Sequence, residues 1–81
     1  MIKRLIECSI GEKLKVLSVN AGHHAKRRLA HLGIIPGVEI IKKNSAPFRG
    51  PIELIVKGSK LVIGRGLATR IMVTTNNSHN L

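Results

Sequence analysis

The side chains most able to do chemistry in this sequence are histidines, three of which lie close together at His23, His24 and His31. His24 and His31 fall on one face of a predicted helix. Seven residues of helix separate them by about 10.5 Å along the axis, which is too far for two ligands that each bind one metal ion at about 2.1 Å. His23 and Arg27 add positive charge to the same face, and this charge opposes cation binding. We therefore expect a solvated basic face, with no metal site and no cofactor.

Catalytic groups are equally sparse. Cys8 is the single cysteine, and no histidine or carboxylate pair stands near it in the sequence to activate the thiol. Four scattered glutamates without an aspartate disfavour paired-carboxylate catalysis. No GxxxxGK[ST] phosphate loop is present, so any nucleotide hydrolysis would belong to a partner. We expect no enzyme activity and a core or rim position for Cys8, while a zinc ion bridging two copies through one histidine or Cys8 stays open as a weak contact.

Composition narrows the range of partners. The 81 residues include 14 lysines and arginines against 4 glutamates, for a formal net charge of +10. Such a chain attracts RNA, an anionic membrane face or an acidic protein. Phe48 is its only aromatic residue, which argues against the aromatic grooves that bind proline-rich peptides and against base stacking. One cysteine, no signal-peptide pattern and no apolar run of about 20 residues predict a cytoplasmic protein without membrane insertion.

One short helix is predicted after the first strand. Asn20 is a suitable N-cap for a helix that begins near Ala21 or Gly22, and Gly33 is placed to end it in the left-handed region. Pro36-Gly37 then has the order that a type II turn requires. On a helical wheel the apolar side chains fall within an inner arc of about 80°, and the basic side chains fall within an outer arc of about 100° on the opposite side. The inner arc holds Ala21, Ala25, Leu29 and Leu32, and the outer arc holds His23, His24, Arg27 and His31.

Five strands are expected along the rest of the chain, with a bulge near Val16 and Leu17 and a hairpin turn at Gly58-Ser59. The segment 64–69 is expected to break the pairing with a single 3₁₀ turn. The expected strands are Lys13–Val19, Val38–Lys43, Ile52–Lys57, Lys60–Ile63 and Arg70–Thr74.

Five short strands with no long helix favour a mainly β fold, a small barrel of about five strands with one inserted short helix. We expect a single domain over residues 1–75 and a flexible tail over 76–81. The expected inward residues are Leu14, Val16, Leu29, Leu32, Val38, Ile40, Ile52, Leu54, Val56, Leu61, Ile63, Ile71 and Val73.

The order of these features resembles the FeoA family, small cytoplasmic proteins that accompany the membrane GTPase-transporter for ferrous iron in bacteria. The resemblance covers roughly residues 5 to 74 and is most specific from the helix to the Pro-Gly turn. It implies an SH3-like barrel, a role in iron homeostasis, and transition metal ion binding as a family description only. Arg49-Gly50 and Leu67 depart from the acidic residues that family members often carry there. The matching residues are Gly11, Arg27-Arg28-Leu29, Leu32-Gly33, Pro36-Gly37, Ala46-Pro47, Gly50-Pro51, Ile52 to Val56, Leu61, Ile63, Ala68, Ile71 and Val73.

The sequence therefore predicts a noncatalytic accessory or regulatory module that docks on the GTPase region of such a transporter, peripheral at the inner membrane through this partner. The alternative is a small basic barrel that binds nucleic acid, with nonspecific binding alone expected from the charge. Outward apolar residues at Ile41, Ile55, Val62 and Met72 would mark an interface or a homodimer seam if they cluster. The candidate partner-binding residues are His24, Arg27, Arg28, His31, Phe48 and Arg49.

Overall fold

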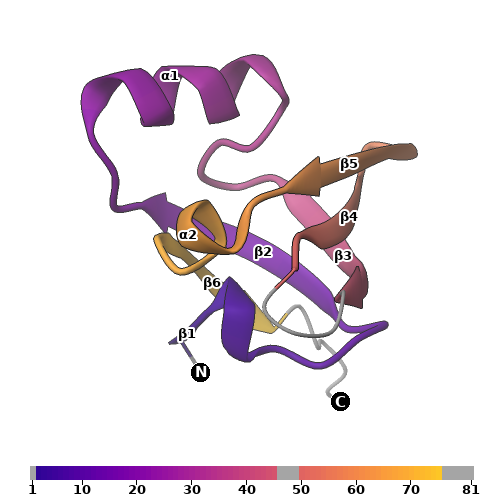
Figure 1. Ribbon diagram of the computed structural model, residues 1–81. Coiled ribbons are helices and arrows are strands. Elements are labelled where there is room, and N and C mark those ends of the chain that lie inside the picture. The colour runs from indigo at the N-terminus through magenta and orange to yellow at the C-terminus, as the bar shows by residue number, and fades with distance from the viewer. Residues whose placement is uncertain (1, 46–49, 76–81) are drawn as a thin grey trace.

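The computed structural model describes residues 2–45 and 50–75 of the chain (Figure 1). Six strands form one antiparallel sheet in the order β1-β6-β2-β3-β4-β5. The mainly β class with one inserted helix is confirmed. The elements are β1 (Ile2–Arg4), η1 (Leu5–Glu7), β2 (Lys13–Val19), α1 (His23–His31), β3 (Glu39–Ser45), β4 (Ile52–Val56), β5 (Ser59–Ile63), α2 (Arg65–Ala68) and β6 (Ile71–Thr75).

The N-terminal segment contains structure that the sequence patterns did not predict. β1 pairs with β6, with Lys3 opposite Val73, and the 3₁₀ helix η1 follows it directly. Since β1 has three residues and η1 has three, neither is long enough to show a hydrophobic period. The expectation of five strands was therefore one strand short.

Two turns differ in detail from the prediction. Segment 64–69 contains the short α-helix α2 in place of a 3₁₀ turn. The β4–β5 hairpin turns at Lys57-Gly58, one residue earlier than expected, because Val56 pairs with Ser59. Both central residues have positive φ, 52° for Lys57 and 81° for Gly58, as the tight type I′ hairpin requires. The bulge in β2 is confirmed by a register shift between Val16 and Ser18.

The core is aliphatic and lies on the inner face of the curved sheet. Most of the expected inward residues are buried, but Leu32 is 44% exposed, and Val38 and Leu61 are only partly buried. Within the described ranges, five further residues belong to the core: Leu5, Cys8, Val19, Ile34 and Ala68. The N-terminal segment thus contributes two core residues of its own.

Candidate interaction surface

The basic helix α1 carries four of the six predicted partner-binding residues. His24, Arg27, Arg28 and His31 are all exposed, whereas Leu29 is the one buried residue of the helix. Figure 1 shows α1 standing at one end of the molecule, beyond the strands. The other two predicted residues, Phe48 and Arg49, lie outside the described residues. The structure therefore places the basic face of α1 where a partner could reach it.

The start of α1 differs from the prediction. The N-cap is Gly22, and no side chain caps the helix. Asn20 instead bonds to Arg70, the residue before β6: its backbone N–H donates to the carbonyl of Arg70 at 2.7 Å, and its own carbonyl accepts from Arg70 Nη1 at 3.4 Å. Arg28 and His31 lie in the last turn, where positive charge offsets the negative end of the helix dipole. Arg28 thus has a structural role that needs no partner.

The end of α1 is fixed by a Schellman motif. The N–H of Gly33 donates to the carbonyl of Ala30 at 3.0 Å, and the N–H of Ile34 donates to that of Leu29 at 2.9 Å. Gly33 has φ +94°, in the left-handed region that such caps require. Ile34 and Leu29 are both buried. The helix is therefore anchored through Leu29 and Ile34, and Leu32, at the C-cap, points away from the core.

The turn after α1 ties the helix to the sheet. The N–H of Val38 donates to the carbonyl of Ile35 at 3.1 Å, and Gly37 has φ +94°, which confirms the predicted type II turn at Pro36-Gly37. Gly37 N–H also donates to the carbonyl of Val16 at 2.8 Å. The basic face of α1 is thus held on a short, hydrogen-bonded connection to β2 and β3.

The basic face includes a shallow recess of about 220 Å³ lined by His23, Lys26, Arg27 and Ala30. Lys26 and Arg27 bring two basic side chains to this recess beside Ala30. Hydrogen-bond donors with positive charge around a small hollow suit a carboxylate or another anionic group. The sequence indicated the charge of this face but not the recess.

A second hollow lies on the outer face of β3 and β4. Ile41 and Ile55 are directly opposed, and both line a groove of about 630 Å³ that the turn from Ile35 to Gly37 also lines. Val62 lies on β5, opposite Glu53 of β4. Met72 lies on β6, opposite Ser18 of β2. The structure therefore brings together two of the four predicted outward apolar residues.

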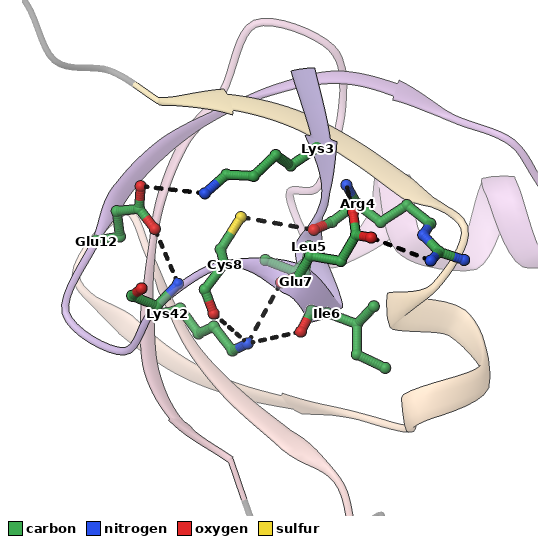
Figure 2. A network of polar contacts seen from close by, with 9 residues as sticks. Lys3, Arg4, Leu5, Ile6, Glu7, Cys8, Glu12 and Lys42 are labelled. Carbon is green, nitrogen blue, oxygen red and sulfur yellow. Dashed lines mark hydrogen bonds and ion pairs between the residues drawn. The ribbon is translucent and has the colours of Figure 1, made fainter. Parts of the chain in front are cut away.

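A buried lysine holds the N-terminal segment against the sheet (Figure 2). Lys42 is 4% exposed, and its Nζ donates to the carbonyls of Cys8 at 2.7 Å, Ile6 at 3.2 Å and Leu5 at 3.4 Å. Burial lowers the pKa of the Lys42 ammonium. Sequence reasoning missed this residue, although Ile40 was expected to face inward and a strand repeats every two residues.

Cys8 takes the core position expected of it. Its side chain is 6% exposed, and Sγ donates to the carbonyl of Arg4 at 3.5 Å. Burial raises the pKa of the thiol, so the reactive thiolate is scarce at neutral pH. Among residues 2–45 and 50–75, no three histidine, cysteine or acidic side chains gather as a metal site. No helix in the same ranges is long and apolar enough to cross a membrane.

Comparison with known proteins agrees with the fold and with the helix-to-turn signature. The FeoA domain model matches residues 3–75. A protein of Methanocaldococcus jannaschii, provisionally named Fe(2+) transport protein A, is 40% identical over 65 residues, which is 78% of this chain and 74% of that protein.

Two solved structures share the whole architecture. One is the crystal structure of an iron uptake regulatory protein (FeoA), with 38% identity, a TM-score of 0.82 and coverage of 91% of this chain and 96% of that one. The other is the solution structure of the FeoA protein of Chlorobium tepidum, with 31% identity, a TM-score of 0.88 and coverage of 96% and 74%. With its family model matched over residues 3–75, the chain belongs to the FeoA family.

Proposed function

We propose that this protein is a noncatalytic accessory module of a ferrous-iron transport system, and that it acts by docking on the cytoplasmic GTPase region of the transporter. Membership of the FeoA family and the name of the archaeal relative support the link to Fe(2+) transport. Iron is then the cargo of the transporter. The module would work in the cytoplasm and reach the inner membrane only through this partner.

The exposed basic face of α1 is the observation that best supports the docking role. Four exposed side chains of α1, His24, Arg27, Arg28 and His31, share this short helix, and the hydrogen bonds after Leu29 fix its orientation. A rigid, positively charged element loses little entropy on binding and speeds association with an acidic surface. Phe48 and Arg49 remain candidates for the same contact by sequence alone.

Binding of the full chain to the purified cytoplasmic domain of the transporter from the same organism tests this proposal. Arg27→Glu and Arg28→Glu should each weaken binding by about tenfold or more, because each reverses one charge at the contact. Lys43→Glu makes the same charge change at an exposed position of β3 and should change binding by less than about threefold. No binding by the unmodified chain, or equal losses in all three variants, would refute docking through α1.

Truncation gives a further check on the proposed module. A chain shortened to residues 1–75 should bind as tightly as the full chain, since the family match ends at residue 75. RNA is the competing ligand, because the net charge of +10 attracts any polyanion. RNA binding that survives about 200 mM salt would favour the nucleic-acid alternative, whereas loss by that point indicates backbone attraction alone.

A further inference from the structure

A row of four side chains crosses the outer face of the sheet from β2 to β5, with one from each strand. At its centre Ile41 stands opposite Ile55. Lys13 is opposite the first isoleucine and Lys60 is opposite the second. Directly opposed residues in antiparallel strands project their side chains on the same face. The row therefore has two adjacent isoleucines with a lysine on either side.

The two isoleucines form the floor of the groove of about 630 Å³ described above. Both are only partly buried, and Ile35, which also lines the groove, is 45% exposed. The volume lies within the range of about 300–1,000 Å³ typical of binding pockets. Apolar surface gathered in a hollow is the arrangement that marks interaction sites, in contrast to isolated exposed side chains.

The outer face of the sheet around this groove carries an excess of positive charge. Lys57 and Glu39 line the groove itself, and Lys13 and Lys60 stand at the two ends of the row. Both carboxylates on this face have lysine neighbours, since Glu39 lies opposite Lys15 and Glu53 is 3.8 Å from Lys60. Four lysines thus share this face of the sheet with two glutamates. An acidic partner would complement the net positive charge of the face.

We infer that this groove binds a short acidic segment of another protein, in which two adjacent apolar side chains are flanked by carboxylates. The apolar pair would pack on Ile41 and Ile55, while the carboxylates would meet Lys13 and Lys60. This surface is separate from the basic face of α1, and the inference holds whether or not α1 docks on a transporter.

Two other occupants fit the groove less well. A second copy of the chain carries the same net charge of +10, so two such faces in contact would bring eight lysines together. Nucleic acid would match the charge, but the described residues that line the groove include aliphatic side chains and no aromatic ring on which a base could stack.

The spacing of the row sets the length of the segment. Lys13 and Lys60 are three strand spacings apart, or about 14–15 Å between backbones. An extended peptide spans about 3.3 Å per residue, so four or five residues cover this distance. A hexapeptide with two central apolar residues therefore places a carboxylate near each lysine.

Nuclear magnetic resonance titration of the ¹⁵N-labelled full chain tests the inference with the peptide acetyl-Glu-Glu-Ile-Leu-Glu-Glu-amide. The amide shifts should concentrate on β3, β4 and the ends of the row. Two control peptides replace the glutamates with lysines or the Ile-Leu pair with serines, and each should bind at least about tenfold more weakly.

Matched variants locate the contact. Ile41→Ser and Ile55→Ser should each weaken peptide binding by about tenfold or more, and Lys13→Gln combined with Lys60→Gln should weaken it and reduce its salt dependence. Ile10→Ser makes the same change at a position that is 58% exposed and does not line the groove, so it should bind as the unmodified chain does. Thermal unfolding checks that every variant is folded.

Four results would overturn the inference. The acidic peptide could shift α1 in place of the groove, it could bind Ile41→Ser and Ile10→Ser equally well, or the lysine peptide could bind as tightly as the acidic one. Stronger shifts of the same row with a uridine hexanucleotide would also overturn it and would assign the groove to nucleic acid.

Discussion

Replacing Lys42 with methionine should weaken the attachment of the N-terminal segment to the sheet and lower the stability of the fold. The Lys42 ammonium is the donor for the carbonyls of Leu5, Ile6 and Cys8, and the same strand holds this segment through the N–H of Gly11, which donates to the Lys42 carbonyl at 2.6 Å. Methionine has a similar length but no donor. The variant leaves three backbone acceptors without their partner, and these cannot be replaced by apolar groups.

The size of the effect follows from the three bonds. The bond to Cys8 at 2.7 Å is buried and charge-assisted, and bonds of this kind contribute about 1.5–3 kcal/mol. The bonds to Ile6 and Leu5 are longer and should add less. Removing a buried ammonium relieves its desolvation cost and offsets part of the loss. We expect a net loss of about 2–3 kcal/mol, or about 10–20 °C in Tm for a domain of this size.

Urea and thermal unfolding followed by circular dichroism measure this loss, with Lys43→Met as the control. Lys43 is exposed on the same strand, so its substitution should stay within about 0.5 kcal/mol of the unmodified chain. Because burial lowers the pKa of Lys42, the unfolded state binds the proton more tightly. The stability that Lys42 contributes should therefore rise as the pH increases toward its ordinary pKa of 10.5. A Lys42→Met variant as stable as Lys43→Met would refute this reasoning.

Three further outcomes are expected. Gly33→Ala should lower the free energy of unfolding by about 1–2 kcal/mol, because φ is +94° and the new Cβ would lie 3.3 Å from Val56 Cγ1. As the control, a Cβ added in Gly66→Ala meets nothing within 4 Å, so this variant should leave the unfolding midpoint unchanged or raise it. The Arg4 side chain and N–H hold the pKa of Glu7 below its ordinary 4.5. The contribution of Glu7 to stability is therefore present above that pH and is lost as the pH falls through the lowered pKa. Glu7→Gln should lower Tm at about pH 7 and have no effect at about pH 2. Cys8 should react with a thiol reagent at least about tenfold more slowly in the native chain than in urea, and equal rates would contradict its burial.

Local signals were enough to predict α1 and its connection to β3. Gly33 and the Pro36-Gly37 pair specify their conformations within a few residues, and Gly33 and Gly37 have the positive φ expected of them. Alternating apolar residues likewise predicted β2 to β6, because each of these strands has one face on the core. Both kinds of signal are contained within a single element.

The N-terminal segment could not be predicted in this way. Its short strand and 3₁₀ helix depend on β6 and on Lys42, which is 34 residues beyond Cys8. A lysine in a strand is ordinarily taken as exposed, and only the three carbonyls that surround it make its burial favourable. Such a contact is a property of the folded chain and leaves no local pattern.

Leu32 shows where a helical wheel fails. The wheel continued the helix to residue 32, but α1 ends at His31, and the left-handed Gly33 rotates the chain. Ile34 consequently fills the position next to Leu29, and Leu32 is left exposed. Sequence reasoning also placed Ile41 and Ile55 outward correctly, yet it needed the register of β3 against β4 to bring them together.

Uptake of radioactive ferrous iron by cells that lack this protein tests the proposed function most directly. Under iron limitation we expect uptake to fall, to recover when the unmodified chain is restored, and to stay low when Arg27→Glu or Arg28→Glu is supplied at the same level. Lys43→Glu should restore uptake fully. Unchanged uptake in the cells without the protein would contradict a role in ferrous-iron transport.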